Sequence, residues 1–396
     1  MEQKIKKFNV DRFNLEKIRL GTQPVSLTRK EYKEPMVINS YLVNDNGQRT
    51  GTKGDMYQKI IMDRILQEGC LDHNPRPYYI DTYKDAKYDP THHTITDFKG
   101  NTIQLYEKDN VIVHENEVEV RVPAHTISLN TGIECTYDLS KGESPLITLR
   151  PIAINASIAE ILWIYQKESN DLVVFDELRG KNTWDINGQI NNWWKDWAIT
   201  DEAGKYILNK DGHPTIGACY GETVRRRHIL KEEVINAIKK NPDGRRNISC
   251  MWQQDDFKEK HGLKPCAFMT IWNVRHDWDG KDYLDMTLVQ RSSDFATAGC
   301  INQVQYASLL IMVARELGLN PGKFTWKPIN IQLYDRHLNQ AIEILNREPI
   351  SCKAEIKLNE KVNTFEDVKP EDIMIEDYPR ELIKTKNPQL RFPLGI

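Results

Sequence analysis

The chain has 396 residues, of which 39% are hydrophobic and 9% aromatic, and its formal net charge is −3. This composition excludes a disordered chain, and the length can supply a large packed core. The near-neutral, interspersed charge argues against dedicated nucleic-acid binding. No apolar run is long enough to span a membrane, and the charged N-terminal residues lack the apolar centre of a signal peptide. We therefore expect a soluble, cytoplasmic globular protein.

The first predicted helix covers residues 57–69, where apolar residues recur at helical spacing before a glycine. The polar region that follows contains strand patterns at 111–113 and 118–122. A further pair of strands is predicted at 126–128 and 146–149.

The second half of the chain begins with a strongly apolar predicted helix at 154–165. Another helix is predicted at 231–239, where Asn-Pro-Asp-Gly ends it. The remaining elements are strands at 247–252, 268–274 and 284–290 and helices at 303–317 and 339–345. Strands and helices are interleaved without strict alternation, so the predicted fold class is α+β.

The seven cysteines are odd in number, widely spaced and without a CxxC pair, which suits neither a disulfide framework nor a zinc site. We therefore expect no metal. Cys266 follows a proline just before a predicted strand, where a cysteine can be a packing residue or a nucleophile. A nucleophile needs a neighbouring cation to lower a thiol pKa of about 8.5. The nearest candidates in the sequence are Arg245, Arg246 and Arg291.

Two further patterns admit a functional and an ordinary interpretation. Gln290-Arg-Ser-Ser-Asp294 combines a guanidinium with a hydroxyl, which suits a phosphomonoester, although a polar loop would look the same. Glu160 lies on an apolar helix face, where an unpaired buried carboxylate costs several kcal/mol. Glu160 is therefore either paired or kept for acid–base chemistry.

The order of these motifs over residues 140–396 resembles the thymidylate synthase family. The motifs that carry the resemblance are Pro145-Leu-Ile-Thr-Leu-Arg150, Glu160-Ile-Leu-Trp163, Trp184-Asp185, Tyr220-Gly221, Asp243-Gly-Arg-Arg246, Pro265-Cys266, Gln290-Arg-Ser-Ser-Asp294, Asn302, Trp326, Tyr334, Asn346-Arg-Glu-Pro349 and Phe392-Pro-Leu-Gly-Ile396. The resemblance implies a thymidylate synthase-like fold with flanking helices and a mixed β-sheet at the interface of a homodimer. It also divides the chain into an N-terminal extension, 1–55, and a catalytic domain, 56–396, with a β-rich insertion at 77–123.

The resemblance also implies roles in chemistry on dUMP with 5,10-methylenetetrahydrofolate as co-substrate. Cys266 would add to C6 of the uracil ring and so make C5 nucleophilic, which is covalent catalysis. Glu160 would move protons on the pyrimidine and the folate, and Tyr220 would assist proton removal at C5. Asn302 would read N3–H and O4, because an amide both donates and accepts. This amide favours dUMP over dCMP, since cytosine-specific relatives carry a carboxylate there.

The same match assigns residues to the substrates. For the nucleotide, these are Arg291 and Ser292 at the phosphate, Arg245 and Arg246 from the partner subunit, Tyr334 at the 3′-hydroxyl and Gln332 near the sugar. For the folate, they are Asp294 at the pterin, Arg150 at the tail, and Trp184, Trp163 and Ile396 closing over it. The text Arg49-Thr-Gly-Thr52 copies the family's phosphate loop but precedes the first helix. We favour Arg76 for the phosphate-loop role because it follows that helix.

Several positions depart from the family pattern, in which ordinary members have histidines in place of Ala267 and Gln332 and a glycine in place of Ala298. These departures surround the pyrimidine and its ordered water, and viral relatives hydrate the C5 methylene. We therefore favour 5-hydroxymethyl-dUMP as the product and a phage origin, in which case the location is the host cytoplasm. The alternative is a thymidylate synthase proper, which makes dTMP and dihydrofolate. A second alternative is a non-catalytic nucleotide- or RNA-binding homologue.

Overall fold

The computed structural model describes residues 51–75, 77–130, 133–181, 190 and 192–395, together with four two-residue strands nearer the N-terminus. These strands are β1 (Ile5–Lys6), β2 (Tyr32–Lys33), β3 (Val37–Ile38) and β4 (Tyr41–Leu42). Four residues discussed above, Arg49, Arg76, Trp184 and Ile396, lie outside the described residues.

The described part contains eight α-helices. They are α1 (Lys53–Glu68), α2 (Ile154–Tyr165), α3 (Leu172–Leu178), α4 (Gly221–Arg227), α5 (Ala237–Lys240), α6 (Cys300–Glu316), α7 (Leu338–Asn346) and α8 (Arg380–Lys386). The predicted helices correspond to α1, α2, α6 and α7, and the prediction at 231–239 to α5 and the helical turn before it. Helix α1 begins earlier than predicted because Thr52 and Asp55 form a capping box at its N-terminus.

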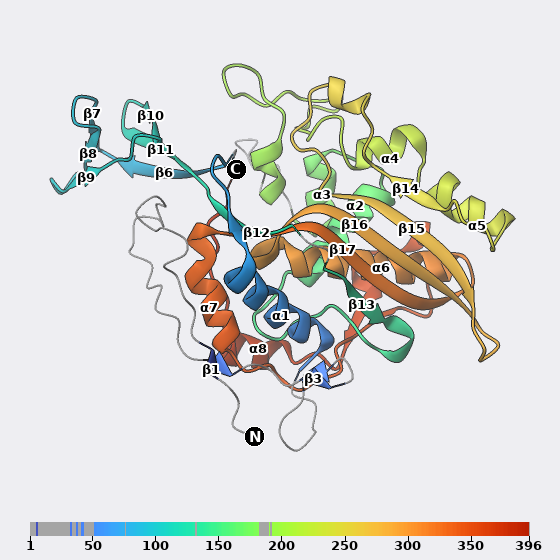
Figure 1. Cartoon of the computed structure of the whole chain (residues 1–396). Helices are drawn as coiled ribbons and strands as arrows, with labels where there is room; N and C mark the ends of the chain where they lie inside the picture. Colours follow the sequence, from blue (N-terminus) through green and yellow to red (C-terminus); the bar gives the residue numbers. More distant parts are fainter. Residues whose placement is uncertain are drawn as a thin grey trace.

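A seven-stranded mixed sheet forms the centre of the molecule (Figure 1). Its strands are β5 (Cys70–Leu71), β12 (Thr126–Leu129), β13 (Cys135–Asp138), β14 (Ile248–Cys250), β15 (Ala267–His276), β16 (Asp282–Asp294) and β17 (Asn320–Tyr334). Strands β16 and β17 are parallel, and the other pairs are antiparallel. Helix α6 makes the crossover that a parallel pair requires. It lies against β16 and β17, and α2 packs on α6, so the main core forms between them.

Residues 78–123 form an arm that extends away from this body (Figure 1). One small sheet of the arm consists of β10 (Asn110–Val113), β11 (Glu117–Pro123) and β6 (Tyr78–Lys84). The other consists of β7 (Lys87–Asp89), β8 (Thr94–Thr96) and β9 (Thr102–Gln104). The arm has a hydrophobic cluster of its own, which includes Tyr79, Val118, Val120 and Tyr334. A last pair, β18 (Glu355–Leu358) with β19 (Ile373–Glu376), lies in the C-terminal region.

One predicted strand, 146–149, is wrong. Leu146 and Leu149 are buried as an apolar strand would be, but their segment forms no ladder. Its backbone instead bonds to side chains of α1 and its cap: Thr148 N–H donates to Asp55 Oδ1 at 2.6 Å, and Leu146 C=O accepts from the Thr52 hydroxyl. Since buried backbone groups need only a hydrogen-bond partner, polar side chains can take the place of a neighbouring strand.

Among the described residues, the helices are too short or too polar to cross a lipid bilayer.

Candidate active site

Cys266 lies at the entry of the central sheet, directly before β15, and is half-buried. The Cys266 carbonyl accepts from the Arg291 backbone N–H at 2.9 Å. The register of β15 on β16 shifts between Ala267 and Met269, which marks a β-bulge directly after the cysteine. Such bulges are common next to functional sites, where they re-aim neighbouring side chains.

Tyr220 supports this segment from the opposite side. Its hydroxyl accepts from the Cys266 backbone N–H at 3.0 Å, and its ring is buried. The backbone of Tyr220 has φ +48° and ψ −114°, just before α4 begins. A bulky residue at positive φ is strained, and such strain persists where the surrounding structure fixes it, often at functional sites. Tyr220 is therefore held close to the cysteine at some conformational cost.

Arg291 braces the cysteine loop. Its Nε donates to the Pro265 carbonyl at 2.9 Å and its Nη2 to the Lys264 carbonyl at 2.7 Å. Burial raises the pKa of the Cys266 thiol, while the charge of Arg291 and the contact with Tyr220 oppose that rise. As expected, Arg291 acts to lower this pKa, but desolvation outweighs its charge in this arrangement.

Glu160 lies on α2 and is only 7% exposed. Desolvation raises its pKa to about 7. The N–H groups of Gln305 and Trp194 approach the carboxylate and oppose this rise, although neither closes to a standard hydrogen bond. Of the two interpretations left open by the sequence, this environment favours acid–base work, because a group with a pKa near neutrality both gives and takes protons readily.

The amide of Asn302 is oriented by a chain of hydrogen bonds. Trp326 Nε1 donates to Gln290 Oε1 at 2.8 Å, and Gln290 Nε2 donates to Asn302 Oδ1 at 3.0 Å. Asn302 Nδ2 in turn donates to Gln305 Oε1 at 3.0 Å. An indole N–H can only donate, so it determines the direction of every bond in the chain. The amide that we expect to read the pyrimidine is thereby held in one orientation.

Residues assigned to the nucleotide gather at the ends of β16 and β17. The Ser292 hydroxyl donates to Gln332 Oε1 at 3.3 Å, and Gln332 lies opposite Asp294 in the parallel register. Tyr334 is buried at the end of β17, and its pKa is raised by burial and by the charges of Asp294 and Cys266. The register of the parallel pair therefore brings several predicted nucleotide and folate residues to one end of the sheet.

Asp294 ends β16 and connects to the C-terminal segment through His337. The Asp294 carboxylate accepts from the Thr297 hydroxyl at 2.5 Å, and its Oδ1 lies 3.7 Å from Nδ1 of the fully buried His337. The other ring nitrogen of His337 is bonded to the carbonyl of Pro393 at 2.6 Å. His337 thus holds the last described residues through Pro393, and its other ring nitrogen lies near the predicted pterin-binding aspartate without a hydrogen bond to it.

Two of the predicted folate residues, Arg150 and Trp163, are almost fully buried. Arg150 is 3% exposed, and its guanidinium donates to backbone carbonyls of Pro151, Ala296 and Thr297. Trp163 is 0% exposed, and its indole N–H donates to the Asp171 carbonyl at 2.8 Å. In this arrangement both side chains lie in the protein interior, and their expected contacts with the folate stay predictions.

Arg245 and Arg246 lie in the loop before β14. Both are exposed, and neither forms an ion pair with any residue that the structure describes. Their guanidinium groups are therefore available to a partner outside their own subunit.

Trp193 and Trp194 are not among the residues predicted from the sequence to form the site. Both interact with the Glu160 carboxylate and oppose the rise in its pKa. The ring of Trp194 packs on that of Tyr220 at 5.4 Å between centroids, and on that of Trp163 at 5.8 Å. The pattern in the sequence that could have indicated them is the presence of three tryptophans within five residues, 193–197. Trp163 thus belongs to the wall behind Glu160, which these indoles complete.

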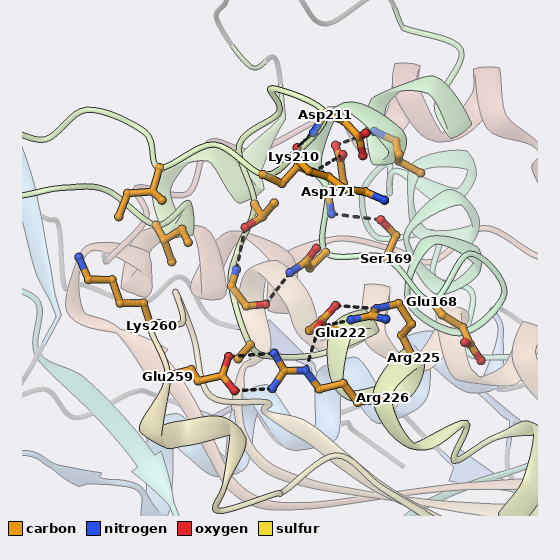
Figure 2. Close-up of a pocket in the computed structure, with 18 of the residues that line it drawn as sticks. Glu168, Ser169, Asp171, Lys210, Asp211, Glu222, Arg225, Arg226, Glu259 and Lys260 are labelled. Carbon is orange, nitrogen blue, oxygen red and sulfur yellow. Dashed lines mark hydrogen bonds and ion pairs between the residues drawn. The ribbon is translucent and has the colours of Figure 1, made fainter.

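A surface pocket of about 830 Å³ lies apart from these residues, and none of the predicted site residues lines it (Figure 2). Its two arginines are already paired. Arg225 reaches Glu222 at 2.6 Å, and Arg226 contacts both Glu222 and Glu259 (Figure 2). The lining is a neutralised set of opposite charges, and we assign no function to it.

Comparisons with known proteins agree on one family. A family model described as thymidylate synthase matches residues 106–387. A thymidylate synthase from Streptococcus pneumoniae (strain 70585) is 36% identical over 347 residues, covering 87% of this chain and 100% of the relative. Another thymidylate synthase, from Lactococcus lactis subsp. lactis (strain IL1403), is 40% identical over 267 residues, covering 67% of this chain and 86% of the relative. The solved structure of thermostable thymidylate synthase A from Bacillus subtilis matches with a TM-score of 0.60 at 23% identity. The match covers 87% of this chain and 99% of the solved chain, and it supports the fold.

Proposed function

Because this chain belongs to the thymidylate synthase family, a family of one-carbon transferases, we propose that it methylates dUMP at C5 and releases dTMP and dihydrofolate. The observation that carries the proposal is the grouping of Cys266, Tyr220 and Glu160 around one end of the central sheet. The co-substrate 5,10-methylenetetrahydrofolate supplies the carbon and the hydride when it is bound.

Cys266 acts as the nucleophile in this proposal. Its thiolate adds to C6 of the pyrimidine, and the resulting electron density at C5 attacks the incoming carbon. The bulge after Cys266 and the brace from Arg291 support a thiol held in a defined position. Burial raises the pKa of the thiol, so forming the thiolate requires a base that accepts its proton.

Glu160 and Asn302 act on the pyrimidine. A carboxyl with a pKa of about 7 is suited to shuttling protons at neutral pH, and Tyr220 lies close enough for Glu160 to affect its pKa. The oriented amide of Asn302 pairs with N3–H and O4 of uracil. Since Gln305 contacts Asn302 and approaches Glu160, the residue that reads the base and the residue that moves protons share a neighbour.

The nucleotide's phosphate is bound by Arg291 and Ser292, with Arg76 as a further candidate, and the 3′-hydroxyl by Tyr334. We place Arg245 and Arg246 across the interface of a homodimer, where their exposed guanidinium groups reach the partner's phosphate. The outer face of the central sheet supports this assembly. Helices cover one face of the sheet, but the other face keeps accessible side chains. On that face Ile329 is 47% exposed, and the side chains that are only partly buried are Thr287, Val289 and Thr325.

The relatives' names favour the methyl product over the hydroxymethyl product that the sequence departures suggested. The wall of Trp193 and Trp194 beside Glu160 also favours hydride transfer, because it limits access of water. The hydroxymethylase remains the second candidate, on one observation: Gln332, which replaces a family histidine, bonds to Ser292 and so changes the polar surroundings of the nucleotide.

The product decides between the two candidates. Purified protein is incubated with dUMP and 5,10-methylenetetrahydrofolate, and the products are identified by mass spectrometry. We expect dTMP together with dihydrofolate. A nucleotide one oxygen heavier than dTMP, with tetrahydrofolate returned, would establish the hydroxymethylase instead. No product at all would contradict both candidates.

Asn302 should determine the choice of base. In the variant Asn302→Asp we expect dUMP turnover to fall by at least about a hundredfold and turnover of dCMP to appear, because a carboxyl group matches the N3 and 4-amino pattern of cytosine. The measurement compares kcat/KM for dUMP and dCMP. The matched control is Asn330→Asp, which changes a residue at the same end of the sheet that lies opposite Ser292. Unchanged base preference in Asn302→Asp would remove Asn302 from this role.

A further inference from the structure

The arm contacts the body of the enzyme at the turn that follows β17, which consists of residues 334–337. This turn begins with Tyr334, the residue assigned to the 3′-hydroxyl, and ends with His337, which holds the C-terminal segment. Contacts that fix the turn therefore affect the position of the residue assigned to the nucleotide and the position of the C-terminal segment.

The first contact between arm and turn is a buried hydrogen bond. The hydroxyl of Tyr79, on β6, donates to Asp335 Oδ1 at 2.6 Å, and both residues are buried, at 1% and 0% exposure. The Arg336 backbone N–H approaches the same hydroxyl at 3.4 Å. A buried carboxylate is costly without partners, and Asp335 Oδ1 accepts here both from the Tyr79 hydroxyl and from the Arg336 backbone N–H, the latter at 2.8 Å.

The second contact is a bidentate ion pair. Arg336 Nη1 and Nη2 each lie 2.7 Å from a carboxylate oxygen of Asp81, which is also on β6. The pair is shielded, with side-chain exposures of 10% and 14%. The Arg336 guanidinium also lies over the Tyr79 ring, 4.1 Å from its centroid. Two planar hydrogen bonds and a ring contact give this junction a defined geometry.

The third contact is hydrophobic and includes Tyr334 itself. Tyr334 packs in the hydrophobic cluster of the arm, with its ring edge-on to Tyr79 at 6.2 Å between centroids. Gly395, near the end of the chain, passes so close that an added Cβ would lie 2.7 Å from the Tyr334 ring and 3.0 Å from Ala124. The C-terminal segment thus lies against both Tyr334 and Ala124, the residue that follows the arm.

We infer that Tyr79 and Asp81 are positioning residues of the active site: through Asp335 and Arg336 they fix the turn after β17, and so place the Tyr334 hydroxyl for the nucleotide's 3′-hydroxyl. The inference rests on the proposed function, because it uses the role of Tyr334. It gives the inserted arm a function within its own subunit, as an external support of the sugar site.

The test compares two ligands that differ only at the sugar. The dissociation constants of dUMP and of 2′,3′-dideoxyuridine 5′-monophosphate are measured by calorimetry for the wild type, Tyr79→Phe and Asp81→Ala. The wild type should prefer dUMP by about tenfold, the effect of one good hydrogen bond. In both variants this preference should fall to about twofold. Affinity for the dideoxynucleotide should stay unchanged, since it makes no contact with the Tyr334 hydroxyl.

Tyr79→Phe keeps the ring and its packing, so the variant isolates the hydroxyl. Arg121→Ala is the matched control, because it removes an arm ion pair, with Glu119, that does not touch the turn. An equal loss of affinity for both ligands, or an unchanged preference for dUMP in an active enzyme, would overturn this inference but leave the proposed function intact. A wild type that neither binds nor converts dUMP would overturn the proposed function, and this inference with it.

Discussion

Turnover of dUMP is expected to fall by about four orders of magnitude or more in the variant Cys266→Ser, because the hydroxyl is a far weaker nucleophile than the thiolate at neutral pH. Release of tritium from [5-³H]dUMP measures this loss independently of whether the product carries a methyl or a hydroxymethyl group. Binding of dUMP should be nearly unchanged, since the phosphate, sugar and base contacts assigned to other residues remain.

The matched control for this variant is Cys250→Ser. Cys250 lies on β14 and pairs with Met269 of β15, so it occupies the neighbouring strand and is half-buried like Cys266. We expect Cys250→Ser to retain at least about half of the wild-type rate, as expected for a near-isosteric change outside the site. Appreciable turnover by Cys266→Ser would contradict covalent catalysis at this residue and leave a binding role for the chain.

Glu160→Gln is expected to reduce kcat by roughly a thousandfold, the middle of the range for losing a general acid–base group. In the wild type, kcat should change with pH around the carboxyl pKa of about 7. The residual activity of the variant should lack that inflection, because an amide does not titrate in this range. The measurement is kcat between pH 5 and pH 9, and an inflection that persists in Glu160→Gln would assign it to another group.

The same substitution should stabilise the protein at high pH. Burial raises the pKa of Glu160 from 4.5 to about 7, so the folded state binds the proton more tightly than the unfolded state. The stabilisation from this tighter binding is complete below pH 4.5 and is lost as the pH rises through 7. At pH 8 the wild type therefore carries a penalty of up to about 3 kcal/mol, which the neutral amide avoids.

Urea unfolding at pH 5 and pH 8 measures this effect. The free energy of unfolding of Glu160→Gln should exceed that of the wild type at pH 8, with a smaller difference at pH 5. Glu177→Gln is the control, because Glu177 lies on α3 and is exposed, so the same change there removes no buried carboxylate. Equal stabilities of Glu160→Gln and wild type at pH 8 would show that the ionised Glu160 is well solvated.

Local pattern and motif order were enough to predict much of this protein from its sequence. Apolar residues at helical spacing placed α1, α2 and α6, because each buries one side or all of its surface in the core. Alternation placed β11, and the order of motifs identified the family before the fold was known. The long strand β17 was not predicted, because Pro321, Gly322 and Pro328 interrupt the strand pattern within it.

Burial and long-range pairing were decided only by the tertiary structure. Arg150 and Trp163 stand in the expected order, yet both are buried, because side-chain exposure depends on elements far away in the chain. The pKa of Cys266 likewise depends on packing, because burial raises it while the charge of Arg291 lowers it. The bond from Tyr79 to Asp335 joins residues 256 positions apart, and no local pattern specifies such a pair. Composition and spacing describe what each segment prefers, whereas contacts between distant segments arise only when the chain packs.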